Sequence, residues 1–126
     1  MEAGDAMLML DLFNDWEDQV DYKKKAVIFQ EQEPADCMYV VLSGEVEILL
    51  KNEPLGAELP GGIIGEMAMI NANHRSATAV ALRNTTLARI NRDQFREIIS
   101  KSPDFALHVM AVLANRLRVA NMLLAG

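Results

Sequence analysis

The spacing of apolar residues changes twice along the chain, from a helical period near the N-terminus to strand-like runs and back to a helical period. Over residues 7–20 the apolar positions recur at steps of three and four, which predicts a short amphipathic helix. These positions are Leu8, Leu12, Phe13, Trp16 and Val20. We therefore expect one helix ahead of the strands.

Short strands are predicted between about residues 21 and 90, separated by glycine and proline turns. The runs typical of strands are 26–29, 38–42, 45–50, 77–82 and 85–90. Residues 51–54 (Lys-Asn-Glu-Pro) are predicted to form a turn. Many short strands of this kind indicate a mostly β fold with flanking helices (α+β), an antiparallel jelly-roll barrel.

Two helices are predicted over about residues 92–124. Asn91 can cap the first helix, and Gln94 at the third helical position completes a capping box. Ser102 and Pro103 open the second helix as a hydroxyl N-cap followed by proline at the first helical position.

The last helix carries two apolar stripes, which is more than one barrel face requires. One stripe is Ala106, Met110, Leu113, Leu117, Ala120 and Leu124, and the other is Phe105, Val109, Val112, Val119 and Leu123. One stripe would cover the barrel, and the other would form a homodimer with a second subunit. Periodicity alone fits equally well with a broad face that is only core.

The composition is that of an ordinary globular protein, with 51% hydrophobic and 24% charged residues, so we expect a single domain over residues 1–126. The net charge of −6 opposes a nucleic-acid surface. No apolar run approaches the ~20 residues of a membrane span, and the first residues lack the basic region of a signal peptide. A single cysteine, Cys37, excludes an internal disulfide and leaves a thiol-metal site short of ligands. We therefore expect a cytoplasmic protein without a bound metal.

The segment 65–78 carries the strongest candidate chemistry, because Arg75 and a run of small residues follow Gly65 and Glu66. A guanidinium can bond two oxygens of one phosphate, and a carboxylate can accept the hydrogen bond of a ribose hydroxyl. A short helix starting at Glu66 would point backbone N–H groups at the same phosphate, and Gly65 would let the backbone approach the ligand. Singly, Glu66 could be a helix-terminal carboxylate and Arg75 a surface residue. Their spacing together favours a sugar-phosphate site.

This segment closely resembles the phosphate-binding cassette of the cyclic nucleotide-binding domain family, the type of the catabolite activator protein and the kinase regulatory subunits. The resemblance extends from about Leu12 to about Leu124, with supporting matches at 27–29, 38–44 and 60–66. It implies a regulatory, non-enzymatic domain that binds cAMP, with cGMP also possible, and a short helix within the cassette.

The resemblance further implies which residues contact the ligand. The phosphate and ribose contacts would be Gly65, Glu66 and Arg75, with the backbone of Met67, Ala68 and Ala77 and the hydroxyl of Ser76. Aligning residues 113–117 with the similar helix of the family brings Ala120 and Asn121 to the base. The Asn121 amide could bond adenine, and a solvated helix position explains that residue equally well.

Several positions depart from the family pattern. Gln32 stands where a glycine is usual, Lys24-Lys25 where a Pro-Gly or Ala-Gly turn is common, and Ile64 where an aromatic residue often precedes the cassette. Activators of this family continue into a helix-turn-helix domain, whereas this sequence stops at Gly126. The expected partners are therefore a second copy of the chain and an unknown effector protein, without nucleic acid or membrane.

Two other function classes fit the predicted fold less well. Metal-dependent enzymes with a jelly-roll barrel need clustered histidines, but His74 and His108 lie on different predicted elements. The second class keeps the fold as a dimerisation or protein-interaction module without nucleotide binding, and the cassette residues argue against it.

Overall fold

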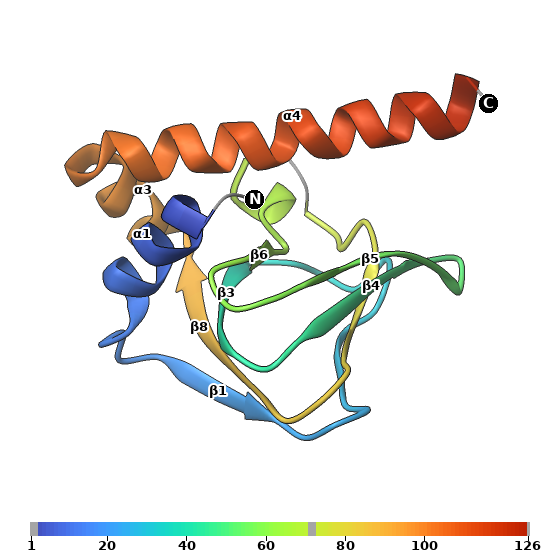
Figure 1. Cartoon of the computed structure of the whole chain (residues 1–126), viewed down its shortest axis with the longest axis horizontal. Helices are drawn as coiled ribbons and strands as arrows, with labels where there is room; N and C mark the ends of the chain where they lie inside the picture. Colours follow the sequence, from blue (N-terminus) through green and yellow to red (C-terminus); the bar gives the residue numbers. More distant parts are fainter. Residues whose placement is uncertain (1–2, 71–72, 126) are drawn as a thin grey trace.

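The computed structural model describes residues 3–70 and 73–125, which form two four-stranded antiparallel sheets and four helices (Figure 1). The strand orders are β1-β8-β3-β6 and β2-β7-β4-β5. In chain order the elements are α1 (Ala3–Phe13), β1 (Gln19–Tyr22), β2 (Val27–Phe29), β3 (Cys37–Ser43), β4 (Val46–Leu50), β5 (Glu53–Glu58), β6 (Ile63–Ile64), α2 (Met67–Ile70), β7 (Thr78–Ala81), β8 (Thr85–Asn91), α3 (Arg92–Lys101) and α4 (Pro103–Ala125). The predicted fold class, a jelly-roll barrel with flanking helices, is confirmed.

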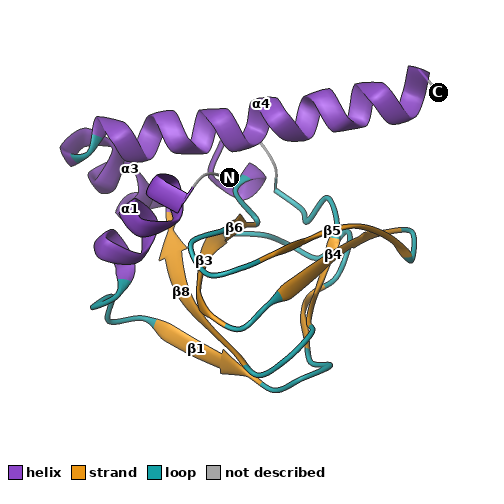
Figure 2. Cartoon of the chain, viewed as in Figure 1, coloured by secondary structure: helices purple, strands orange, loops and turns teal. Residues whose placement is uncertain are grey.

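Strand β3 is the centre of the core because both of its faces are covered (Figure 2). Side chains alternate across a strand, so Met38 and Val40 pack toward the helices while Tyr39 and Val41 pack toward the second sheet. The helical side of this core is completed by Met9, Phe13, Phe95, Phe105 and Val109. A continuous apolar run is expected of a strand that is buried on both faces.

The first helix is shorter than predicted. It ends at Phe13, and the segment from Gln19 onward forms β1, whose Val20 pairs with Leu87 of β8. The Trp16 indole donates to the backbone carbonyl of Arg89 over 2.7 Å, which holds the connection against β8. The predicted helix over 7–20 was therefore wrong beyond Phe13, because pairing with a distant strand overrides the local periodicity.

Strand β5 occupies part of the segment that was predicted as a turn. It begins at Glu53 and includes Pro54, and the true turn is confined to the preceding Lys51 and Asn52, both of which have positive φ angles. Proline is tolerated here because β5 is the edge of its sheet and pairs only with β4.

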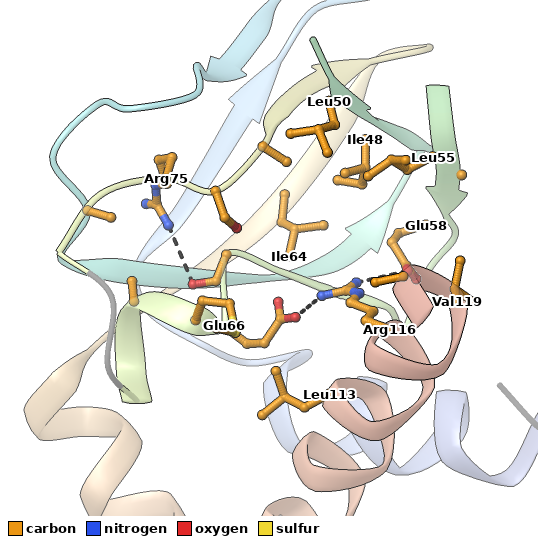
Figure 3. A pocket seen from close by; sticks show the side chains of 18 of the residues that line it. Ile48, Leu50, Leu55, Glu58, Ile64, Glu66, Arg75, Leu113, Arg116 and Val119 are labelled. Carbon is orange, nitrogen blue, oxygen red and sulfur yellow. Dashed lines mark hydrogen bonds and ion pairs between the residues drawn. The ribbon is translucent and has the colours of Figure 1, made fainter. Parts of the chain in front are cut away.

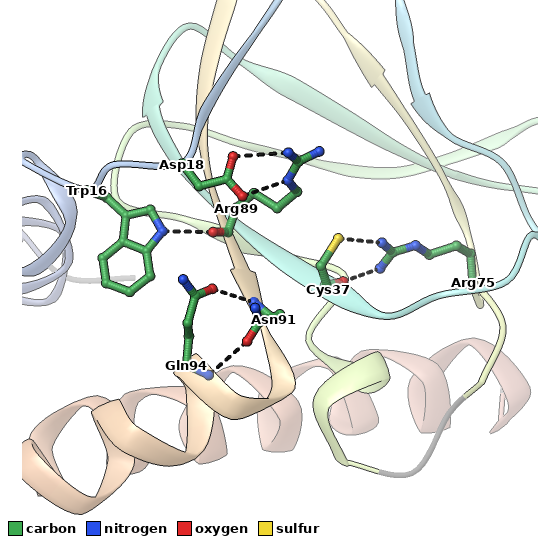
Figure 4. Close-up of polar contacts among 7 residues, drawn as sticks. All are labelled: Trp16, Asp18, Cys37, Arg75, Arg89, Asn91 and Gln94. Atoms are coloured by element: carbon green, nitrogen blue, oxygen red, sulfur yellow. Dashed lines mark hydrogen bonds and ion pairs between the residues drawn. The ribbon is translucent and has the colours of Figure 1, made fainter.

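Both C-terminal helices begin as predicted. Asn91 and Gln94 form the complete capping box of α3 (Figure 4). The Ser102 hydroxyl accepts from the backbone N–H of Phe105 at the start of α4. Helix α4 runs across the barrel over α2 (Figure 1). None of the helices in the described part of the chain is both long and apolar enough to cross a membrane.

The two stripes of α4 differ in burial. Phe105 and Val109 of the second stripe are fully or almost fully buried in the core, whereas Met110 and Leu117 of the first stripe are 56% and 62% exposed, and Val119 of the second is 43% exposed. Helix α4 therefore has a buried face toward the barrel and an apolar face that the chain itself does not cover. Leu123 and Leu124 lie in the last turn, outside the residues whose side chains are described.

The departures at Lys25 and Gln32 have a structural counterpart, because both residues adopt positive φ angles, 76° and 71°. An L-residue in the left-handed region is disfavoured by contact between its Cβ and the following carbonyl, and glycine is not. The turns have kept the geometry that glycine would favour while using other residues.

Lys25→Gly should therefore raise the free energy of unfolding by about 0.5–1 kcal/mol, the relief of left-handed strain less the added freedom of glycine in the unfolded chain. Chemical denaturation measures this directly. Lys24→Gly is the matched control. The φ angle of Lys24 is not positive, so this substitution relieves no strain and should lower the free energy of unfolding. Equal effects of the two substitutions would contradict the interpretation.

His108 on α4 is buried, and its Nε2 atom has no hydrogen-bond partner among the described residues. Burial lowers the pKa of His108, against the opposing charges of Asp5 and Glu58. The folded state therefore holds a neutral imidazole that the unfolded chain protonates below about pH 6.5.

Stability from His108 should therefore be lost as the pH falls below about 6.5. The unfolding free energy of wild type relative to His108→Leu, which cannot titrate, should decrease between pH 7.5 and pH 5.5. Denaturant unfolding at the two pH values measures this difference. A constant difference would show that the imidazole has the same pKa in both states.

Candidate functional site

A cavity of about 680 Å³ opens between the segment 65–77, the β4–β5 hairpin and α4 (Figure 3). This volume lies within the range of small-molecule sites. Of the predicted site residues, those that line it are Gly65, Glu66, Met67, Ala68, Arg75, Ser76 and Ala77. The fold thus brings these seven predicted residues together at the cavity.

Asn121 is the predicted site residue that the fold leaves apart. It is exposed on α4 and does not belong to the cavity lining, whereas its neighbour Ala120 does. Along α4 the lining consists of Leu113, Asn115, Arg116, Leu117, Val119 and Ala120.

Arg75 is buried, with only 6% of its surface exposed, which excludes the alternative of an ordinary surface arginine. Its Nη1 donates to the carbonyl of Cys37 over 2.7 Å, and its Nη2 lies 3.4 Å from the Cys37 sulfur (Figure 4). The guanidinium carbon lies 4.2 Å from the centroid of the Phe29 ring. No ion pair of Arg75 is found among residues 3–70 and 73–125.

Gly65 is required at its position for two reasons. Its φ angle is +73°, in the left-handed region, and a Cβ atom there would lie 2.5 Å from Nη1 of Arg75. The Gly65 carbonyl also accepts a long hydrogen bond from Nη1, at 3.5 Å. Any side chain at this position would displace the Arg75 guanidinium.

The backbone after Gly65 turns into the single-turn helix α2. The N–H of Ala68 donates to the Gly65 carbonyl over 3.2 Å, and the N–H of Met69 to the Glu66 carbonyl over 3.0 Å. The cassette helix predicted from the resemblance is present, one residue later than Glu66. Ser76 is exposed at the opposite end of the cassette and lines the cavity.

Glu66 lies at the floor of the cavity and is 98% buried, with 2% of its surface exposed. Its Oε1 atom accepts a hydrogen bond and ion pair from Nη1 of Arg116, which reaches it from α4 (Figure 3). None of the described residues donates to the other oxygen, Oε2. That oxygen is therefore the one available to a ligand.

Arg116 lines the cavity as well and was not among the predicted site residues. Its Nη2 donates to Oε1 of Glu58 over 3.0 Å and to the carbonyl of Ile63 over 2.8 Å, so one side chain joins α4 to β5, β6 and Glu66. Burial would lower the pKa of Arg116, but Glu66 and Glu58 outweigh it and raise the pKa, which keeps the guanidinium charged. The available signal was an arginine between Leu113 and Leu117, within the apolar face of the helix.

The remaining walls of the cavity are apolar. The hairpin contributes Ile48, Leu50 and Leu55, and α4 contributes Leu113, Leu117 and Val119 (Figure 3). The cavity therefore has a charged end at Arg75 and Glu66 and an apolar compartment between the hairpin and α4. A flat aromatic group attached to a charged sugar phosphate matches this division. Among the described residues, no cluster of three or more histidine, cysteine or acidic side chains could hold a metal ion.

Comparisons with known proteins agree with this geometry. A family model described as the cyclic nucleotide-binding domain matches residues 19–102. The chain is 30% identical over 112 residues to the CRP-like cAMP-activated global transcriptional regulator of Mycobacterium tuberculosis, covering 84% of this chain and 50% of that protein. The chain thus spans about half the length of such curated relatives.

Solved structures of cyclic nucleotide-binding proteins are also similar to this chain. The catabolite activator protein of Thermus thermophilus superposes with a TM-score of 0.77 at 28% identity, covering 99% of this chain and 59% of that one. The cAMP-bound form of the EAL enzyme Bd1971 has a TM-score of 0.61 at 37% identity and covers 81% and 29%. The cGMP-bound form of Bd1971 has a TM-score of 0.60 at 38% identity and covers 79% and 28%. The chain therefore belongs to the cyclic nucleotide-binding domain family.

Proposed function

We propose that this domain binds cAMP as a regulatory sensor and that α4 responds to the ligand. The observation that carries the proposal is Arg75, a buried guanidinium without a carboxylate partner in the described part of the chain. A buried charge is costly unless it is paired. A cyclic phosphodiester, which carries one negative charge, would supply the missing partner.

The cavity suggests how the rest of the ligand would be held. With the phosphate at Arg75, the ribose hydroxyl would donate to Oε2 of Glu66, and the base would enter the apolar compartment under α4. Ser76, Met67, Ala68 and Ala77 line the same cavity, and we expect the Ser76 hydroxyl and the backbone of the other three to complete the phosphate contacts. These contacts are our expectation for the complex.

The choice between cAMP and cGMP rests on the ligands named for similar proteins. The curated relative from M. tuberculosis is named for cAMP, whereas Bd1971 has been solved with either nucleotide. The apolar compartment would accept both bases, and we place cAMP first because of the curated relative. Asn121 remains a predicted base contact, and because it lies outside the cavity lining it would reach a base only from α4 of a second subunit.

The response of α4 would depend on Arg116. This residue connects the helix to Glu66, the carboxylate that we expect the ribose to use. A ligand that changes the hydrogen bonding of Glu66 changes the free energy of the Arg116 contact. A ligand shifts the position of a helix only if it binds the two conformations of the protein with different affinities. The shared contact with Glu66 would supply that difference.

The exposed face of α4 favours a second role for the same helix. Met110 and Met122 are exposed on α4 and do not line the cavity, and exposed apolar side chains of this kind are typical of a helix that meets another helix. We propose a homodimer through α4, in which the ligand alters the contact with an effector protein. A module that dimerises without binding nucleotide is the alternative.

Isothermal titration with cAMP tests the binding proposal. Wild type should bind cAMP, and Arg75→Gln should weaken binding by about 2–5 kcal/mol because a charged partner of the phosphate is lost, which is roughly 30-fold to several thousand-fold. Arg83→Gln is the control, since Arg83 is exposed and pairs with Glu45 outside the cavity lining.

The control should bind as wild type does. No heat of binding for any cyclic nucleotide would contradict the proposed function. Equal affinity of wild type and Arg75→Gln would contradict the phosphate role of Arg75.

Hydrogen exchange of α4 tests the response of the helix. In wild type, cAMP should change the exchange of the backbone amides of residues 113–120. Arg116→Gln should bind more weakly and lose most of this ligand-dependent change, because the connection to Glu66 and Glu58 is removed. Arg118→Gln, two positions further and exposed, should behave as wild type. An undiminished change in Arg116→Gln would refute the coupling.

A further inference from the structure

Arg92, the first residue of α3, contacts the wall of the cavity without lining the cavity itself. Its Nε donates to the carbonyl of Ala68 over 3.0 Å, and its Nη2 donates to the carbonyl of Ala35 over 3.3 Å. Ala35 and Ala68 both line the cavity. One guanidinium therefore holds two residues of the cavity wall by their backbone carbonyls.

The first contact is with the cassette helix α2. The last carbonyl groups of a helix lack partners within it, and basic side chains nearby commonly donate to them. All residues of α2 belong to its last turn, because the helix has only four residues, and Ala68 is 3% exposed. The hydrogen bond from Arg92 therefore ties a buried part of α2 to the start of α3.

The second contact is with the loop between β2 and β3, which is bonded to the other end of the cassette. The N–H of Ala35 donates to the carbonyl of Asn73 over 2.9 Å, and the N–H of Arg75 donates to the carbonyl of Glu33 over 2.8 Å. The N–H of Gln32 donates to the carbonyl of Arg75 over 2.9 Å. Through Ala35, Arg92 is thus connected to the backbone that carries Arg75.

The position of Arg92 is unfavourable for its own helix. The N-terminus of a helix carries a partial positive charge, so an acidic residue stabilises it and a basic residue does not. Asp93, the next residue of α3, has the favourable charge. The contacts with Ala35 and Ala68 explain a cation at the first position of α3, and helix stability does not.

We propose that Arg92 is a positioning residue for the ligand site, which fixes α2 relative to residues 73–75 before a ligand binds. We call α2 and residues 73–75 the two arms of the cassette. This inference rests on the proposed function and adds a residue outside the cavity on which the affinity for the ligand depends.

The spacing of the two arms matters because each carries groups that we expect at the phosphate. The backbone of Met67 and Ala68 belongs to α2, and the guanidinium of Arg75 belongs to the other arm. These groups can contact one phosphate together only if the arms are correctly spaced. A site that already has this geometry loses little freedom on binding, which favours affinity.

Calorimetric titration with cAMP tests the inference. Arg92→Gln removes the charged donor and should weaken binding at least about tenfold, the usual size of a lost hydrogen bond from a charged group. Arg92→Lys keeps the charge but lacks the planar fork that reaches both carbonyls, so it should bind about threefold more weakly than wild type. Arg96→Gln is the matched control, because Arg96 is exposed on the same helix and does not line the cavity. It should bind as wild type does.

Hydrogen exchange of the unliganded protein separates positioning from general stability. In Arg92→Gln the amides of Ala68, Met69 and Arg75 should exchange severalfold faster than in wild type, because the two arms open more readily. The amides of β3 and β8 should keep their wild-type protection, and saturating cAMP should restore most of the protection of the arms. Faster exchange throughout the barrel would show a purely structural role and would overturn the inference.

The outcomes separate the two proposals. If wild type binds no cyclic nucleotide, the proposed function fails, and the role of Arg92 in binding fails with it. If wild type binds cAMP and Arg92→Gln binds it equally well, only the inference is overturned. Should Arg92→Gln fail to fold, Arg92→Lys decides, since wild-type affinity of that variant would also overturn the inference.

Discussion

The candidate site depends on the burial of one positive charge, the guanidinium of Arg75. Arg75 is enclosed by two aromatic rings, a carbonyl and a sulfur, with no carboxylate of the described residues in an ion pair with it. Such burial costs free energy in the unliganded protein, and several local features exist because of it. Gly65 lacks a Cβ where a side chain would meet Nη1, and the turn at Gln32 accepts a positive φ angle next to the Arg75 backbone. Strain of this kind is found where a site must be formed before its ligand arrives.

The second arginine of the cavity has the opposite arrangement. Arg116 is paired with Glu58 and Glu66, so its charge is compensated within the protein and it connects elements instead of attracting a ligand. Because Glu66 is common to this pair and to the expected ribose contact, the ligand and α4 would compete for, or share, the same carboxylate. The proposed sensor therefore needs no long pathway, because α4 lines the cavity and Arg116 connects this helix directly to Glu66.

Sequence analysis was successful where the signal is local. Strands β2, β3, β4, β7 and β8 and the capping box of α3 follow from turns and periodicity, and the grouping of Gly65, Glu66 and Arg75 follows from spacing. It failed where distant partners decide. The first helix ends at Phe13 because the following segment pairs with β8. Pro54 lies within a strand because β5 is at the edge of its sheet, where proline is tolerated. The contacts of Arg116 with Glu58, and of Phe29 and Cys37 with Arg75, join residues far apart in the chain and were not predictable from spacing.

The most direct measurement is the unfolding free energy of Arg75→Met compared with wild type, with and without saturating cAMP. If the buried charge is held for a ligand, the variant without ligand should be at least as stable as wild type, because an unpaired buried charge has been removed. At about 100 times the dissociation constant, cAMP should stabilise wild type by about 2.7 kcal/mol and the variant hardly at all. A variant that is much less stable without ligand, or that cAMP stabilises as much as wild type, would contradict this account.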